Sequence, residues 1–178
     1  MTVALVPFEG AHFSTLRSWF ESAEEVVLWG GADLPYPLEE VHLAAMLAEA
    51  AATPPARRCW SALVDGEVVG HAQLAYDWRN GLARLARVAI APHLRGKGHA
   101  ASMLRRVIDE AFEHPAIERV ELNVFSHNAR AIELYRRLGF RDEGNRRRAA
   151  KVGEARWDML IMGLLRDEAR GPRSPDGR

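Results

Sequence analysis

The chain is organised around one stretch, Arg87-Val-Ala-Ile-Ala-Pro-His-Leu-Arg-Gly-Lys-Gly-His-Ala-Ala-Ser-Met-Leu104. It has the pattern of a buried strand over residues 88–91, ended by Pro92, then a turn, then a helix whose apolar positions recur with a helical period. The turn contains Gly96 and Gly98, which let a ligand approach the backbone closely. A helix N-terminus also favours an anion, through its free N–H groups and its dipole. The stretch therefore predicts an anion site between a strand and a helix.

Two familiar phosphate loops fit this turn poorly. The Walker pattern needs four residues between its glycines and a hydroxyl side chain after its lysine, but Lys97 lies between the two glycines and His99 follows Gly98. Gly96-x-Gly98-x-x-Ala101 does satisfy the relaxed dinucleotide fingerprint. That loop normally follows the first strand of its fold, whereas several candidate strands precede it here. A dinucleotide-dependent oxidoreductase therefore stays open only as an alternative.

A third pattern, Arg95-x-x-Gly98-x-Ala100, fits at each position. It resembles the pyrophosphate loop of the GNAT superfamily of N-acetyltransferases, which binds acyl-coenzyme A after a buried strand. A second hallmark of that superfamily, Asn-x-x-Ala-x-x-x-Tyr-x-x-x-Gly-Phe, matches residues 128–140. The second motif predicts an amphipathic helix capped by Asn128 and ended by a glycine. With both motifs in this order, the chain most resembles the group that contains ribosomal-protein N-terminal and polyamine acetyltransferases.

Periodicity and turn signals divide the rest of the chain into strands and helices. We expect strands over residues 3–8, 58–64, 67–76, 82–91, 117–125, 140–148 and 155–165. We expect helices over residues 12–20, 38–52, 100–112 and 128–138. Residues 21–37 have no clear period and contain turn residues, so we expect a surface connection. The predicted fold class is α+β, a GNAT-like mixed, mostly antiparallel sheet of about seven strands with helices on both faces.

Composition limits the organisation and the partners. The 178 residues are 48% apolar, so we expect one domain over residues 1–166, followed by a polar, disordered tail over 167–178. The 24 basic residues match the 24 acidic ones, and no global field indicates nucleic acid or an anionic membrane as a partner. The single cysteine, Cys59, excludes an internal disulfide and a cysteine-rich metal site, and we expect no metal. Without a membrane-length apolar run or a leader pattern, the expected location is cytoplasmic.

The resemblance implies how acetyl-coenzyme A binds. In that fold the two central strands, here residues 82–91 and 117–125, separate, and the pantetheine arm enters between them. This is strand addition used for a ligand, with one backbone N–H placed to polarise the thioester carbonyl. The residues implied in cofactor binding are Val88, Ala89, Ile90, Arg95, Gly96, Lys97, Gly98, His99, Ala100, Ala101, Asn128 and Tyr135.

The reaction needs a neutral amine and a proton for the departing thiolate. Tyr135 is the position that similar enzymes use to protonate the coenzyme A sulfur, although a tyrosine on an apolar stripe is otherwise a core residue. Several relatives place a glutamate base five residues before the motif asparagine, where this chain has Asn123, which cannot take a proton. Glu121, on the same face of that strand, could act through water, and the chain could also work without a protein base. Further alternatives for the base are Asp158, His71 and Asp77.

Large aromatic side chains outside the motifs are candidates for the walls of an acceptor site. Trp29 and Tyr36 lie in the connection 21–37, and Trp78 lies in a turn between two strands. Each could equally attach its segment to the core. We predict that they border the mouth at which the acceptor enters and disfavour the charged form of its amine.

Three classes of function remain open: an acetyltransferase, a non-catalytic acyl-coenzyme A sensor and the oxidoreductase already mentioned. We predict the first, in which an acetyl group moves from acetyl-coenzyme A to a primary amine by direct attack. The acceptor would be the α-amino group of a peptide, a protein or a small amine, more readily than a polyamine. The retained Tyr135 favours an enzyme, whereas the missing glutamate favours a sensor. The partners would be acetyl-coenzyme A and the amine, and a homodimer is left open.

Overall fold

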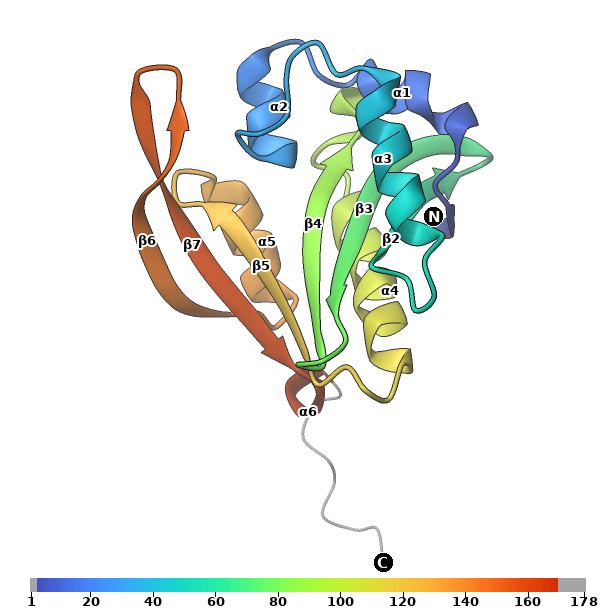
Figure 1. Cartoon of the computed structure of the whole chain (residues 1–178), viewed down its shortest axis with the longest axis vertical. Helices are drawn as coiled ribbons and strands as arrows, with labels where there is room; N and C mark the ends of the chain where they lie inside the picture. The colour runs from blue at the N-terminus through green and yellow to red at the C-terminus, as the bar shows by residue number, and fades with distance from the viewer. Residues whose placement is uncertain (1–2, 170–178) are drawn as a thin grey trace, which may run out of the picture.

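The structure is a computed structural model that describes residues 3–169. Over this range seven strands form one sheet in the order β1-β2-β3-β4-β5-β7-β6 (Figure 1). The strands are β1 (Ala4–Pro7), β2 (Arg57–Val64), β3 (Glu67–Asp77), β4 (Leu82–Ile90), β5 (Arg119–Phe125), β6 (Arg141–Val152) and β7 (Ala155–Leu165). Among them, β4 and β5 pair in parallel and all other neighbours are antiparallel. The predicted class of sheet is confirmed.

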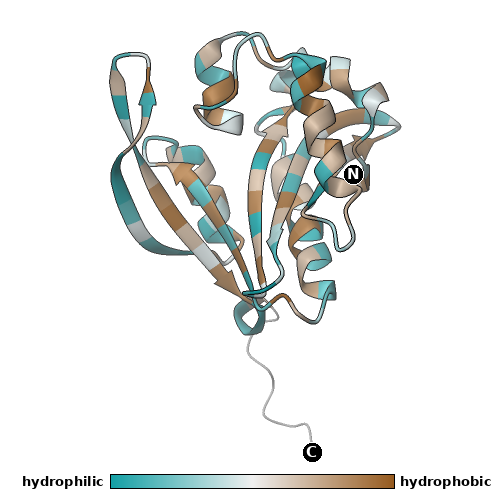
Figure 2. Ribbon diagram, viewed as in Figure 1, coloured by the Kyte–Doolittle hydropathy of each residue, from teal (hydrophilic) through white to brown (hydrophobic). Residues whose placement is uncertain are grey.

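Helices cover both faces of this sheet, as predicted. One face is covered by α4 (His99–Glu113) and α5 (Ala129–Arg137), which pack on the apolar residues of the central strands. The other face is covered by α1 (Phe13–Arg17), α2 (Ala23–Gly30) and α3 (Glu40–Ala50), which enclose a second core cluster. Figure 2 shows hydrophobic and hydrophilic bands in turn along the central strands, whereas the edge strand β6 is largely hydrophilic. The short elements are η1 (Gly10–His12), η2 (Pro92–Leu94) and α6 (Arg166–Ala169).

Residues 21–37 contain the helix α2, so the prediction of a connection without a helix is wrong. The Ser22 hydroxyl caps the helix by accepting from the Glu25 N–H, and acidic residues in the first turn complement its dipole. The Glu25 carboxylate in turn accepts from the backbone N–H of Glu21, at 2.7 Å. This Ser-x-x-Glu pattern was the available signal. The helix buries Trp29, which therefore belongs to a regular element.

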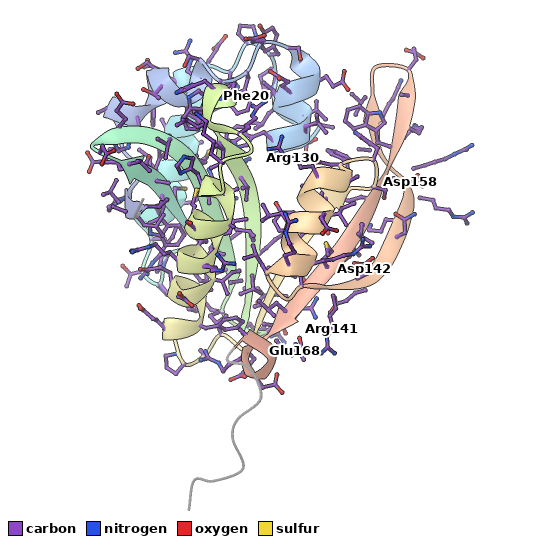
Figure 3. All side chains as sticks on the ribbon, turned by 180° about the vertical axis from the view of Figure 1, so that it is seen from behind. Phe20, Arg130, Arg141, Asp142, Asp158 and Glu168 are labelled. Carbon is purple, nitrogen blue, oxygen red and sulfur yellow. The ribbon has the colours of Figure 1, made fainter. Side chains whose placement is uncertain are left out.

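The C-terminal boundary also differs from the prediction. Asp167, Glu168 and Ala169 are not part of a disordered tail but belong to α6, and residues 170–178 lie outside the described part of the chain. The Glu168 carboxylate forms an ion pair with Arg141 at 2.9 Å, and Figure 3 labels the two residues near each other at the base of the sheet. Arg166 donates to the Phe112 carbonyl, in the last turn of α4, and to the Ile117 carbonyl, just before β5, and these hydrogen bonds attach α6 to the domain.

The two central strands separate after a short parallel pairing. The pairing covers residues 82–85 of β4 and 119–122 of β5. Beyond it β4 continues to Ile90 on the side of β3, and β5 continues to Phe125 on the side of β7. The strands diverge toward the top of Figure 1. The separation that the resemblance implied is therefore present.

A β-bulge lies where the strands separate. Arg87 and Val88 of β4 together oppose the single residue Ala72 of β3, and Arg87 has a φ of 51°. Trp29 of α2 donates from its Nε1 to the Arg87 carbonyl at 2.8 Å. Because a bulge bends its strand, this hydrogen bond from a helix on one face stabilises the bend that directs β4 away from β5.

The histidine His71 is enclosed between β3 and the helices α1 to α3, with 1% of its surface exposed. Its Nε2 lies 2.8 Å from the side-chain nitrogen of Gln73, and the rings of Phe8 and Trp29 pack against the imidazole. Its Nδ1 has no hydrogen-bond partner among the described residues. Burial, assisted by the positive charge of Arg87, lowers the pKa of His71 to about 3. The imidazole is therefore neutral in the folded protein at neutral pH.

This burial predicts a loss of stability in acid. Below the ordinary pKa of 6.5 the unfolded chain binds a proton at His71 that the folded chain does not bind, so stability falls as the pH drops from 6.5 toward 3. Between pH 7 and pH 5 this coupling amounts to about 2 kcal/mol. We expect His71→Gln to lose less stability over that interval by about this amount, measured by urea unfolding. His93→Gln, at an exposed histidine, is the control that should keep the parent's pH dependence, and an equal acid loss in His71→Gln would contradict the account.

Candidate active site

A cavity of about 400 Å³ opens where β4 and β5 separate. We call it the strand-gap cavity. It is lined from one face of the sheet by α2 and from the other by α5, so it passes between the two central strands. Its polar lining residues are Arg57, Arg84, Arg87, Asn123, Asn128 and Tyr135.

A second cavity, of about 390 Å³, lies on the α4 and α5 face between the end of β4 and the loop 95–98. We call it the loop cavity. Four residues line both cavities: Val88, Asn128, Ala131 and Leu134. The two cavities therefore adjoin at the β4 bulge, and a long ligand could enter from the loop and place one end in the strand gap.

The loop that borders the second cavity has the conformation of an anion site. Gly96 and Gly98 have φ values of 86° and 87°, a region that favours glycine. Gly98 is also the N-cap of α4, where it has no side chain to accept from the first helical N–H groups. A Cβ atom built on Gly98 would meet nothing within 4 Å. The loop thus leaves both free N–H groups and open space in front of the helix dipole.

The first turns of α4 and α5 contain no acidic residue, whereas those of α2 and α3 do. Acidic residues are favoured at helix N-termini, so their absence leaves these two ends able to face an anion. Arg130, in the first turn of α5, lines the loop cavity, and Figure 3 shows it at the upper end of α5 on the side of α4. A basic residue in the first turn of a helix is unfavourable with the helix dipole. This unfavourable placement is the sequence signal that would have identified Arg130. Arg137 lines the same cavity and was also missed.

Most of the predicted cofactor residues lie around this loop. Val88, Ala89, Ile90, Arg95, Gly96, Gly98, His99, Ala100, Ala101 and Asn128 line the loop cavity. Lys97 does not line it, and Tyr135 lines the adjoining strand-gap cavity instead. The Asn128 side chain accepts from the Ala131 N–H at 3.2 Å and so caps α5, as predicted. Its position between the cavities also allows contact with a ligand.

Tyr135 lies on α5 where the strand gap meets the loop cavity. It is 8% exposed and its ring packs edge-on against Phe140, with 5.9 Å between ring centroids. Burial raises the pKa of Tyr135 to about 12. The phenol therefore remains protonated over the whole working pH range and can act as a donor, but it cannot act as a base.

The candidate bases do not line the strand-gap cavity. Asn123 does line it, but Glu121 does not, and the Glu121 carboxylate accepts from Arg84 at 2.6 Å and from Arg119 at 3.3 Å. Its lone pairs are therefore already used in ion pairs. Asp158 accepts from the Arg148 N–H at 2.7 Å and lies where β6 and β7 cross in Figure 3.

The two weaker alternatives are also remote from this cavity. His71 is enclosed in the core, and Asp77 accepts from the backbone N–H of Asn80 in the exposed β3–β4 turn. Within the described residues, the lining of the strand-gap cavity contains no aspartate, glutamate or histidine.

Of the three predicted aromatic walls, the structure brings Trp29 to the cavity and leaves the other two elsewhere. Trp29 lines the strand gap from α2. Tyr36 is 45% exposed and donates from its hydroxyl to the Glu21 carbonyl, outside the lining of either cavity. Trp78 lines neither cavity. It stacks on Tyr76 and donates from its indole to the Pro55 carbonyl, so it attaches the β3–β4 turn to the segment before β2.

The glycine loop at the start of α4, the separated central strands and the cavity between them are features of one class of protein, an acyltransferase that uses an acyl-coenzyme A. The model of the acetyltransferase (GNAT) family matches residues 14–140. The chain belongs to that family, and it is an N-acetyltransferase that uses acetyl-coenzyme A. Its sheet, with a single parallel pair among the described strands, also excludes the doubly wound fold of dinucleotide oxidoreductases.

Individual relatives share much of the chain. The L-amino acid N-acetyltransferase AaaT of Escherichia coli (strain K12) is 30% identical over 130 residues, which cover 72% of this chain and 77% of that protein. The aminoglycoside N(6')-acetyltransferase type 1 of Klebsiella pneumoniae is 24% identical over 72% of this chain and 69% of its own length. The structure of spermidine N-acetyltransferase from Vibrio cholerae, in complex with CoA and spermine, superimposes with a TM-score of 0.80 at 20% identity. That likeness covers 95% of this chain and 98% of the other and shows a shared fold.

The loop geometry predicts the effect of a side chain at Gly98. Gly98→Val should weaken acetyl-coenzyme A binding at least about tenfold in calorimetry, because the added atoms occupy the space in front of α4. Gly66→Val is the matched control, since Gly66 has a φ of 85°, equally open surroundings and no place in either cavity. Both variants should lose similar stability. Unchanged affinity in Gly98→Val, or a parent that prefers NAD, would contradict the loop assignment.

Proposed function

We propose that this N-acetyltransferase acts on an α-amino group, which it takes in the neutral form without a carboxylate base. The observation that supports this most is the lining of the strand-gap cavity, which includes three arginines and no aspartate, glutamate or histidine. An ammonium group entering this space meets positive charge and partial desolvation, and both favour its neutral form. The proton then leaves through water rather than through a side chain.

The residues of the loop cavity fit acetyl-coenzyme A. The amides at the start of α4 and the side chains of Arg95 and Arg130 would hold phosphate groups. The edge of β4 from Val88 to Ile90 pairs with β3 on one side only, which leaves backbone groups on the other side for the pantetheine amides. Acetyl-coenzyme A supplies the activated thioester, and one N–H on this edge would stabilise the negative charge that develops on its carbonyl oxygen.

Tyr135 is proposed as the donor to the departing thiolate. It lies at the junction of the two cavities, close to where the end of a pantetheine arm would meet an amine. Its raised pKa of about 12 keeps the proton on the phenol, which can donate a hydrogen bond to the departing thiolate and stabilise its negative charge. Asn123, which also lines the gap, can donate or accept a hydrogen bond to orient the amine but cannot remove its proton.

The choice of an α-amino group rests on the amount of neutral amine available. A lysine-like or polyamine nitrogen with a pKa of about 10.4 is neutral in about one molecule in two thousand at pH 7, whereas the α-amino group at the start of a peptide is neutral in about one in ten. The relative AaaT is named for L-amino acids, which supports the same choice. The likeness to the spermidine N-acetyltransferase structure, at 20% identity, shows the fold alone, and the sequence match to a spermidine N(1)-acetyltransferase covers 33% of this chain.

The role of Tyr135 predicts a selective loss of turnover. Tyr135→Phe should lower kcat by about ten- to a thousandfold and leave acetyl-coenzyme A affinity within a few fold, since only the donated proton is lost. Tyr76→Phe is the control, because Tyr76 is partly buried against Trp78 and lines neither cavity. Unaltered kcat in Tyr135→Phe, with chemistry limiting in the parent, would assign Tyr135 to the core.

The absence of a base from the described cavity lining predicts the pH profile. The rising limb of kcat/KM should follow the pKa of the acceptor amine and should persist in Glu121→Gln and Asp158→Asn. Tyr135, with its pKa near 12, should add no falling limb below pH 10. The measurement is kcat/KM from pH 5.5 to pH 10 with two acceptors of different amine pKa. A limb near pH 6 that vanishes in either carboxylate variant would establish a protein base, and a strict polyamine preference would exclude the proposed acceptor.

A further inference from the structure

Three arginines on the α2 and α3 face line the strand-gap cavity, and they differ in their partners. Arg57 pairs with Glu49 of α3 at 2.6 Å, and Arg84 pairs with Glu121 of β5 at 2.6 Å. Arg87 forms no ion pair with any described residue. Its charge is therefore the one in this lining that no carboxylate neutralises.

The surroundings hold the Arg87 guanidinium in place without neutralising it. Its Nη1 donates to Gln73 Oε1 at 3.4 Å, and the Trp29 ring lies beside it with 6.0 Å from Cζ to the ring centroid. Gln73 Oε1 also accepts from Arg57 Nη1 at 3.0 Å, so one neutral amide oxygen faces two cations. The Gln73 amide nitrogen is directed to Met46 and His71, which determines the orientation of the amide.

The Arg87 guanidinium is partly buried and pairs with no described carboxylate, and the charge of Glu49, which pairs with Arg57, acts on it only from beyond ion-pair distance. Burial, followed by the repulsion from Arg57, lowers the pKa of Arg87. His71, whose ring contacts the Gln73 amide, has its pKa lowered to about 3, so it is neutral and supplies no counter-charge to Arg87. An unneutralised arginine held by a planar amide and an aromatic ring is the arrangement that binds a planar anion in a bidentate manner.

We propose that Arg87 binds a carboxylate of the acceptor, so that the substrate class is α-amino acids and other amines with a nearby carboxylate. This inference rests on the proposed acetyl transfer and specifies its acceptor. Arg87 belongs to the same bulge as Val88, where the two cavities meet, so a carboxylate bound there lies close to the point of transfer.

The charges of substrate and cavity then balance. The reactive form of an amino acid has a neutral amine and one carboxylate, hence a single negative charge, which matches the single unneutralised Arg87. In a free amino acid the carboxylate favours the ammonium form, and pairing that carboxylate with a guanidinium removes this effect. The same contact therefore selects the substrate and helps to release the amine proton. A polyamine would bring only further positive charge into this lining.

The test compares acceptors that differ in this one group: an amino acid, its carboxamide and the corresponding decarboxylated amine, together with spermidine. The panel is repeated for amino acids with each of the common side chains, because the residues that line the cavity do not indicate which acceptor side chain fits. In the parent we expect kcat/KM for the best amino acid to exceed that of its carboxamide by about ten- to a hundredfold. Binding of each compound to the protein with coenzyme A is measured separately by calorimetry.

Two variants then assign the preference to Arg87. Arg87→Gln should reduce the preference for the carboxylate to within about threefold, with the carboxamide rate little changed. Gln73→Glu keeps Arg87 but supplies an internal carboxylate between the two arginines, and it should abolish the preference in the same way. Arg58→Gln is the control, since Arg58 neighbours Arg57 on β2, pairs with Glu110 and lies outside the cavity.

The outcomes separate this inference from the proposed function. Transfer to amines without a carboxylate preference, a best rate with spermidine, or an equal loss for acid and amide in Arg87→Gln would each overturn the inference and leave acetyl transfer intact. Carboxylate-selective binding that Arg87→Gln abolishes, without transfer to any α-amine, would support the Arg87 site and overturn the proposed function. Neither binding nor transfer across the panel would overturn both.

Discussion

The short parallel pairing between β4 and β5 is the constraint on which the two cavities depend. It ends after Leu85 and Leu122, yet both strands continue because β3 and β7 pair with their outer sides. Each strand thus retains one ladder of hydrogen bonds, and the groups on its inner side are left for a ligand. If the pairing extended further, the sheet would close and the junction of the two cavities would be lost. A gap between strands is therefore compatible with a stable sheet.

The bulge at Arg87 lies where the strand-gap cavity and the loop cavity adjoin. It bends β4 and exposes its edge to the loop face, while the Arg87 side chain is directed to Gln73 on the opposite face. Trp29 joins the two faces, because its indole donates to the bulge carbonyl and its ring lies beside the Arg87 guanidinium. One residue of unusual backbone geometry thus shapes the edge of β4 on the loop face and directs its side chain to the opposite face.

The distribution of charge around the strand-gap cavity depends on which ionised groups pair with one another. The chain as a whole has no net charge, and its acidic residues near the cavity are used in pairs with Arg57 and Arg84. Glu121 is the clearest case, since its place on β5 suggests a base but its oxygens already accept from two guanidinium groups. Local pairing, rather than the count of charges, determines which groups remain free to act on a substrate.

The sequence by itself determined the order of the strands, the class of sheet and the glycine turn between β4 and α4, because these depend on local periods and on glycines at fixed spacings. It also placed Asn128 at a helix cap and Tyr135 in the second motif, both confirmed as positions around the cavities. It missed α2, whose sequence is short and nearly without an apolar stripe. Only the tertiary structure decided that Trp29 enters the site whereas Trp78 does not, that Glu121 is neutralised, and that Arg87 is not. Those outcomes depend on pairings between residues far apart in the chain, and a local pattern contains no information about which partner a side chain meets.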